Sequence, residues 1–168
     1  MLGSLITPSR VKLNLESTEW DECFSELLEV MIENNPKIIR TQAISALVQR
    51  EEKMSTAVFP SVAVPHATCN SVKETQIVLG ISSRGVDFED LNNSGKSVKV
   101  NLVFQILFDE NNSAEHLHVL KDILELVKNP KVLDKMLKSK SAEEVCKIIQ
   151  GKYIFLRNYF VKICILEN

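Results

Sequence analysis

Apolar side chains near the start of this chain recur every three or four residues, which is the spacing of one face of a helix. One such pattern covers residues 20–31, and we expect Ser17 or Thr18 to cap the N-terminus of this helix. A second pattern covers residues 40–52. The sequence Asn34-Asn35-Pro36 separates the two, because proline cannot continue a helix. The first third of the chain is therefore predicted to contain two helices.

The middle of the chain has the pattern of buried strands. Residues 62–64 and 75–81 are short apolar runs, and the residues at 82–85 are expected to turn the chain into a short extended piece at 86–88. The most strand-like segment is Val98 to Phe108, whose apolar middle is almost continuous. Such a run is typical of a strand buried on both faces, so helices are expected above and below the sheet.

Helical spacing returns in the last third. We expect Ser113 to cap a helix that buries one apolar stripe, consisting of Leu117, Leu120, Leu124 and Val127. A short helix at 131–137 should follow, and Ser141 with Glu144 forms a capping box for a final helix. This order of helices and strands predicts an α/β fold, a three-layer α/β/α sandwich with a mixed central β-sheet flanked by helices.

The length of 168 residues is that of one domain. We expect it to cover residues 1–151, with a short strand or extended arm within 5–15 and Gly151 as the final helix cap. Residues 152–168 are then a hydrophobic C-terminal extension of unknown role. It contains three basic residues and is too short and too charged to cross a bilayer. Two interpretations of this extension stand: it packs on the domain, or it forms a surface for self-association.

Composition narrows the classes of function. A net charge of −2 is evidence against a nucleic-acid partner, because proteins that bind nucleic acids usually carry a concentrated excess of basic residues. The N-terminus has no secretory signal, and no segment predicts membrane insertion, so a cytoplasmic location is expected. The four cysteines are scattered without a C-x-x-C pair, which indicates a reducing compartment and no zinc site.

The first candidate for chemistry is His66. It follows the apolar run 62–64 and Pro65, and proline has no N–H with which to continue a central strand. We therefore expect the strand to end at Pro65 and His66 to be the first side chain beyond it, held rigidly and open to a loop. A histidine with only a structural hydrogen bond is the competing interpretation.

A second histidine is predicted to join it. The strand that ends at Phe108 leads to His116 in the first turn of a helix. If this strand runs parallel to the one before His66, the two imidazoles lie on one rim of the sheet, where α/β proteins place their sites. His118 lies about 200° further round the helix than His116, so we expect it to be exposed to solvent.

Two imidazoles together fit phosphoryl transfer better than the alternatives. A zinc site needs a third protein ligand at suitable spacing, and a hydrolase needs an activated nucleophile, for which Cys69 has no supporting pattern. In phosphoryl transfer, one imidazole is the nucleophile and the second stabilises the phosphoryl oxygens. Ser55, Thr56 and Thr68 are candidate phosphate-binding hydroxyls, and Arg50 is a candidate cation. No metal or cofactor is implied.

Several motifs resemble, in one collinear pass over residues 4 to 150, those of a known family. The family is the type 2 enzyme IIA of the bacterial phosphoenolpyruvate-dependent phosphotransferase system, which includes fructose, mannitol and nitrogen-regulatory members. Its pattern R-E…S-T…(I/V)-A-(I/V)-P-H is matched by Arg50-Glu51, Ser55-Thr56 and Val62-Ala63-Val64-Pro65-His66. Further similar motifs are Gly85-Val86-Asp87-Phe88 and Glu115-His116-Leu117.

The resemblance implies that His66 accepts a phosphoryl group from a phosphocarrier histidine protein. It also implies that His116 is the second active-site histidine and that Arg50 supports the site. The phosphoryl group would pass to a IIB domain for sugar uptake. Alternatively, the chain is a regulatory module whose docking to a target protein is switched by phosphorylation of His66. The sequence identifies neither the sugar nor the acceptor, and it does not give the oligomeric state.

One segment departs from the family pattern. Where the family has glycines before the strand, this chain has Val58-Phe59-Pro60-Ser61. Because glycine adopts backbone conformations that other residues avoid, we expect an altered approach to the strand here.

Overall fold

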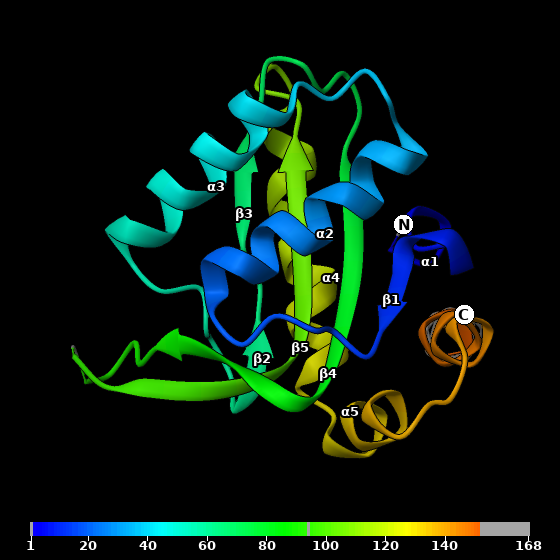
Figure 1. The fold of residues 1–168 in the computed structure, drawn as a ribbon. Helices are drawn as coiled ribbons and strands as arrows, with labels where there is room; N and C mark the ends of the chain where they lie inside the picture. The colour runs from blue at the N-terminus through cyan, green and yellow to red at the C-terminus, as the bar shows by residue number, and fades with distance from the viewer. Residues whose placement is uncertain (1, 94, 152–168) are drawn as a thin grey trace, which may run out of the picture.

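Strand β5, Ser97–Phe108, lies inside the sheet of the computed structural model, which describes residues 2–93 and 95–151 (Figure 1). On one side it pairs antiparallel with β4, Gln76–Glu89. On the other side it pairs parallel with β2, Ser61–Ala63, and with β3, His66–Thr68. Strand β1, Val11–Leu13, pairs parallel with β4 at the opposite edge. The predicted mixed sheet is confirmed.

Helices cover both faces of this sheet and form the two outer layers (Figure 1). One face carries α2 (Trp20–Asn34) and α3 (Arg40–Lys53), and the other carries α4 (Ser113–Val127), α5 (Pro130–Leu137) and a helix over 142–151. Two short helices at the N-terminus, α1 (Leu2–Leu5) and the 3-10 helix η1 (Pro8–Arg10), were not predicted.

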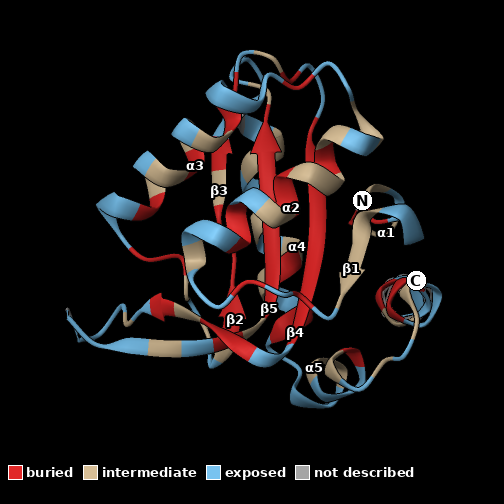
Figure 2. Ribbon diagram, in the orientation of Figure 1, coloured by how far each residue is buried: buried red, intermediate tan, exposed pale blue. Residues whose placement is uncertain are grey.

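Alternate side chains of β5 pack into the two hydrophobic cores on opposite faces of the sheet. Phe104 and Ile106 belong to the core beneath α4, whereas Val103 and Leu107 belong to the core beneath α2 and α3. Every residue of β5 from Leu102 onward is buried (Figure 2). The strand buried on both faces was therefore predicted correctly, because only such a strand has no polar face in its sequence.

The strand before His66 is interrupted at Pro65, as predicted, but His66 does not lie beyond the strand: β2 ends at Ala63 and His66 begins β3. Ala63 lies opposite Val103 and His66 lies opposite Ile106, so the register continues unchanged across the interruption between β2 and β3. Pro65 has no N–H to donate, but its carbonyl accepts a hydrogen bond from the N–H of Ile106 (2.9 Å). This contact keeps the chain beside β5, and His66 is the first residue of a resumed strand.

The expected turn at 82–85 is also wrong. These residues form an irregularity within β4, where the register shifts between Ile81 and Val86. Gly85 has a φ of +79°, and its N–H donates to the hydroxyl of Ser82 (3.0 Å). The extra residues are thus accommodated as a bulge, and β4 continues to pair with β5 beyond it.

Two helix starts differ from the prediction by one or two residues. The N-cap of α2 is Glu19, and that of α4 is Asn112, whose side chain accepts from the N–H of Glu115. The buried stripe of α4 is shifted as well, because Leu117 is 72% exposed. The residues that α4 buries instead are Val119, Ile123, Leu126 and, as predicted, Val127.

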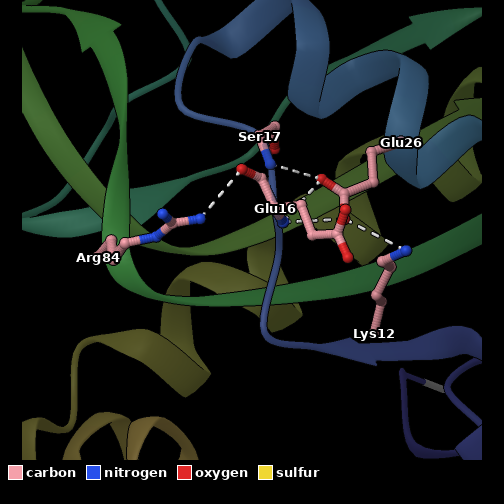
Figure 3. A network of polar contacts seen from close by, with 5 residues as sticks. All are labelled: Lys12, Glu16, Ser17, Glu26 and Arg84. Atoms are coloured by element: carbon pink, nitrogen blue, oxygen red, sulfur yellow. Dashed lines mark hydrogen bonds and ion pairs between the residues drawn. The ribbon is translucent and has the colours of Figure 1, made fainter.

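A polar network fixes the connection from β1 to α2 (Figure 3). The carboxylate of Glu26 accepts hydrogen bonds from the backbone N–H groups of Glu16 and Ser17 and pairs with the ammonium group of Lys12. Burial acts to raise the pKa of Glu26, but these hydrogen bonds outweigh it and lower the pKa below its usual value. Arg84 joins the network by donating to the carbonyl of Glu16 (3.4 Å).

The C-terminal part is described as far as Gly151. The hydroxyl of Ser141 accepts from the N–H of Glu144 (3.2 Å), as expected for a helix cap. No helix within the described residues is long and apolar enough to cross a membrane. The extension predicted at 152–168 lies outside the described residues, as do the residues that would show whether Gly151 caps its helix.

Candidate active site

His66 lies at the edge of the sheet with one ring nitrogen occupied. Val62 and Val64 belong to the core beneath α4, so His66, which alternates with them, presents its side chain on the same side. Its Nδ1 lies 2.8 Å from the carbonyl oxygen of Val64. Because a carbonyl only accepts hydrogen bonds, Nδ1 carries the proton, and the lone pair of the neutral ring is on Nε2. Nε2 is therefore the ring nitrogen that is free to act as a base or a nucleophile.

The interrupted strand explains why the carbonyl of Val64 is available. Val64 lies between β2 and β3, outside the regular ladder, and its N–H donates to the carbonyl of Thr56 (3.0 Å). Pro65 follows with a fixed φ and no donor. The Pro-His pair therefore frees one carbonyl from the sheet and directs it to the imidazole two residues later.

His116 is held in a complementary way on α4. Its Nε2 lies 2.9 Å from the carbonyl oxygen of Asp109, so this nitrogen carries the proton and Nδ1 has the lone pair. The ring stacks on Phe108, with centroids 4.1 Å apart and planes inclined by 27°. Phe108 ends the strand that runs parallel to β3, and this register brings the two histidines to one site.

A cavity of about 500 Å³ connects these residues at the open edge of the sheet. Helix α3 lies on one side of β3 and α4 on the other, so both helices contribute to it (Figure 1). Its lining consists of Ala46, Gln49, Arg50, Lys53, His66, Ala67, Thr68, Phe108, His116 and Leu120. Four of the six predicted site residues thus line one cavity, namely His66, His116, Arg50 and Thr68.

The charges of the cavity suit an anion. Arg50 and Lys53 both line it, and no aspartate or glutamate among the described residues does. Arg50 is oriented by donating from Nη1 to the carbonyl of Met54 (2.8 Å). Lys53 was missed by the sequence analysis, although its place one helical turn after Gln49 and Arg50 was the available signal.

The imidazole of His66 is kept neutral by its surroundings. Burial lowers its pKa below 6.5, and the nearby charges of Arg50 and His116 act in the same direction. The hydrogen bond to Val64 opposes this shift without reversing it. A neutral ring has a lone pair at neutral pH, as a nucleophile requires.

The two remaining predicted hydroxyl residues do not line the cavity. Ser55 and Thr56 are 6% and 1% exposed, and the hydroxyl of Ser55 accepts from the N–H of Ala57 (3.3 Å). His118 is exposed, as predicted, and bonds to the carbonyl of Ala114 through Nδ1. Cys69 is buried with its sulfur 3.1 Å from the hydroxyl of Ser71.

Comparison with known proteins identifies the family. The model of the family described as phosphoenolpyruvate-dependent sugar phosphotransferase system, EIIA 2, matches residues 4–152. The chain belongs to this family. EIIA type 2 proteins include sugar-specific and nitrogen-regulatory members, as the resemblance implied.

The curated relatives of this EIIA chain include proteins named as sugar-specific components and proteins named as nitrogen regulatory proteins. It is 30% identical to the fructose-specific EIIABC component of Bacillus subtilis over 148 residues, which are 88% of this chain but 23% of that protein. It is 25% identical to a nitrogen regulatory protein of Bradyrhizobium diazoefficiens, over 88% of this chain and 94% of that protein. The chain therefore spans about a quarter of the first relative and nearly all of the second.

Solved structures share the fold of this EIIA chain. The nitrogen regulatory protein IIA-Ntr of Neisseria meningitidis has a TM-score of 0.78 and 25% identity, covering 88% of this chain and 98% of that one. IIA mannitol of Escherichia coli, in a complex with phosphorylated enzyme IIB, has a TM-score of 0.71 and 20% identity over 86% of this chain and 96% of that one. The α/β/α sandwich is thus the fold of the family.

Proposed function

We propose that His66 is the residue of this EIIA domain that accepts and passes on a phosphoryl group. The observation that supports this most strongly is the state of its ring, whose Nδ1 is bound to the carbonyl of Val64 while Nε2 keeps its lone pair. The ring borders a cavity whose lining, in the part of the chain that the structure describes, has two cationic side chains and no carboxylate. A dianionic phosphoryl group fits such a site.

The chemical step is a displacement between two imidazoles. The Nε2 lone pair of His66 forms a bond to phosphorus, and the bond from phosphorus to the donor's imidazole nitrogen breaks, returning its electron pair to that nitrogen. The proton on Nδ1 stays in place, and the carbonyl of Val64 stabilises the positive charge that develops on the ring. Arg50 and Lys53 compensate the charge of the phosphoryl oxygens.

His116 is proposed as the second histidine of the site. With Nε2 bound to the carbonyl of Asp109, Nδ1 is the ring nitrogen left to meet the phosphoryl group, and in its N–H form it donates a hydrogen bond to a phosphoryl oxygen. Thr68, which lines the cavity, is a further donor. The buried hydroxyls of Ser55 and Thr56 reach a phosphoryl group only if the loop that carries them moves.

The donor in this proposal is a phosphocarrier histidine protein, and the acceptor is a IIB domain. Supporting evidence for the acceptor is the solved complex of enzyme IIA mannitol with phosphorylated enzyme IIB mannitol, which has the same fold. The name of the fructose-specific relative also joins EIIA to further components in one protein. Transfer to IIB would couple His66 to sugar uptake.

Regulation is the second candidate function. Two relatives named nitrogen regulatory protein match 94% of their own length, so the present chain resembles them almost from end to end. In this case phosphorylation of His66 adds a doubly charged group to the cavity and changes which protein docks there.

Label transfer tests the proposal. The chain is incubated with radiolabelled phosphoenolpyruvate, enzyme I and the phosphocarrier protein of the same organism. We expect acid-labile label on the wild type and on the control His118→Gln, and none on His66→Ala. Absence of label on the wild type with a competent donor, or label that persists in His66→Ala, contradicts the proposal.

A further inference from the structure

The acidic residue beside Arg50 has no role in the site described above. Glu51 is only 7% exposed, and its Oε1 accepts a hydrogen bond from the backbone N–H of Thr56 (2.8 Å). Its other oxygen, Oε2, is buried without a partner among the described residues. Burial raises the pKa of this carboxyl. Burial of a carboxyl group with one oxygen unpaired lowers the stability of the fold, so a compensating role is expected for it.

Three hydrogen bonds connect Glu51 to His66. The first is the bond from the N–H of Thr56 to the carboxylate. In the second, the N–H of Val64 donates to the carbonyl of Thr56 (3.0 Å). In the third, Nδ1 of His66 donates to the carbonyl of Val64 (2.8 Å). Neither Thr56 nor Val64 belongs to a helix or strand, so a regular ladder does not fix them.

We propose that Glu51 is a positioning residue that fixes the orientation and the tautomer of His66 through Thr56 and Val64. This inference rests on the proposed function of His66. Without the carboxylate, the N–H of Thr56 is a buried donor with no acceptor, since Thr56 is 1% exposed. The backbone of Thr56 then moves towards another acceptor and takes Val64 with it.

The backbone on the C-terminal side of Val64 is held by a separate hydrogen bond to the sheet. Pro65 accepts from the N–H of Ile106 in β5, so the sheet holds the chain immediately after Val64. Glu51 holds the side that faces away from β5. Helix α3 thus serves the site with two consecutive residues: Arg50 lines the cavity, and Glu51 stabilises the backbone that holds the nucleophile.

Two conservative variants distinguish the position of the Glu51 carboxylate oxygen from its negative charge. Glu51→Asp keeps the charge but withdraws the oxygen by about 1.5 Å, the length of one carbon–carbon bond. Glu51→Gln keeps the oxygen in place and removes the charge. Glu52→Asp, on the exposed neighbouring residue, is the matched control. Nitrogen NMR of the imidazole reports the tautomer of His66, and the rate of phosphorylation reports its function.

The expected results differ between the variants. In Glu51→Asp, the Nδ1 proton of His66 should exchange rapidly, both tautomers should be populated, and the rate should fall about tenfold or more. Glu51→Gln and Glu52→Asp should keep the Nδ1–H tautomer and most of the rate. A Glu51→Asp variant with wild-type tautomer and rate overturns the inference. So does a Glu51→Gln variant as impaired as Glu51→Asp, because charge would then be the property required.

A measurement on the wild type remains decisive if Glu51→Asp does not fold. The amide proton of Thr56 and the Nδ1 proton of His66 should have similar protection factors, each taken relative to the exchange rate of the same group when unprotected, since opening one bond opens the other. A protection factor of the Thr56 amide more than about tenfold lower than that of the His66 proton overturns the inference. These NMR results do not depend on phosphorylation, so failure of the wild type to take up label tests the proposed function separately.

Discussion

His66 combines a fixed proton on one nitrogen with a half-buried, neutral ring. The fixed proton comes from the hydrogen bond to Val64, and the neutrality comes first from burial and then from the charges of Arg50 and His116. Both properties are set by the immediate environment of the side chain. They lead to predictions that concern single residues.

The pKa of His66 is predicted to lie below 6.5. The neutral, nucleophilic form should then remain dominant as the pH falls through 6.5, and phosphorylation should slow only at lower pH. The same shift makes folding stability fall as the pH falls from 6.5 to the lowered pKa, because the unfolded chain takes up the proton first. Proton NMR titration of the ring checks this. A midpoint at or above 6.5, the value expected for the unfolded chain, contradicts it.

Lys53 is predicted to contribute to phosphoryl transfer although no sequence motif marks it. It lines the cavity but is exposed, so its contribution is expected to be modest and sensitive to salt. The variant Lys53→Ala should lower the rate of phosphorylation at low ionic strength by about twofold to tenfold, and by less at high ionic strength. The matched control is Lys131→Ala, outside the cavity. Equal rates for Lys53→Ala and wild type at low salt count against the role.

At the scale of elements, the turn before β2 shows how this chain replaces the glycines of its family. Phe59 and Val62 exchange two backbone hydrogen bonds, of 3.4 and 2.9 Å, around Pro60 and Ser61. Ser61 has a φ of +65°, a conformation that favours glycine. Proline followed by a residue with positive φ is the pattern of a type II turn. A residue other than glycine thus takes the positive φ of this turn.

Substitution of Ser61 is predicted to reveal this strain. Valine is β-branched and avoids positive φ, so Ser61→Val should reduce the free energy of unfolding by about 1–3 kcal/mol. The same change at Ser83, an exposed position of β4, should alter it by less than about 0.5 kcal/mol. Urea unfolding measures both. If the two variants are equally stable, Ser61 is not strained.

Sequence patterns predicted elements best where burial alone decides them. The strand ending at Phe108 and the helices at 20–31 and 40–52 have regular patterns, and each is present. The bulge at 82–85 was predicted as a turn, because only the neighbouring strand shows that pairing continues beyond it. Similarly, the resumption of the strand at His66 depends on a carbonyl of Pro65 that meets β5.

The candidate site was predicted to a similar degree. The order of Arg50, His66 and His116 along the chain was sufficient to select residues that now line one cavity. The burial of Ser55 and Thr56 was not predictable, since it depends on how the loop after α3 folds back on Glu51. Lys53 was missed because its place one helical turn after Arg50, the available signal, is shared by many exposed lysines that have no role in a site.

For the whole molecule, the distance between the α2 layer and the sheet depends on a glycine. A side-chain carbon at Gly80 would lie 2.8 Å from Cδ1 of Leu15 and 2.9 Å from Cδ2 of Leu27. Gly80→Ala is therefore predicted to lower the free energy of unfolding by about 1–3 kcal/mol, because the side chains of Leu15 and Leu27 must leave their positions in a packed core. Ser83→Ala is the control on the same strand. Urea unfolding with no difference between the two variants contradicts this close approach.

The position of the site in the whole molecule also fits exchange with another protein. The cavity opens at the edge strand of the sheet, between α3 and α4, where a second protein can approach His66. Under the proposed function, sugar transport and regulation would use the same chemistry there and differ in the protein that receives or senses the phosphoryl group.

The most direct test is to determine which atom is phosphorylated. Phosphorus and nitrogen NMR of the protein, labelled in its histidines and phosphorylated by its donor, assigns the bond. The predicted result is phosphorus on Nε2 of His66, with the proton retained on Nδ1 and donated to the carbonyl of Val64. Phosphorus on Nδ1 of His66, or on His116 or His118, contradicts the mechanism.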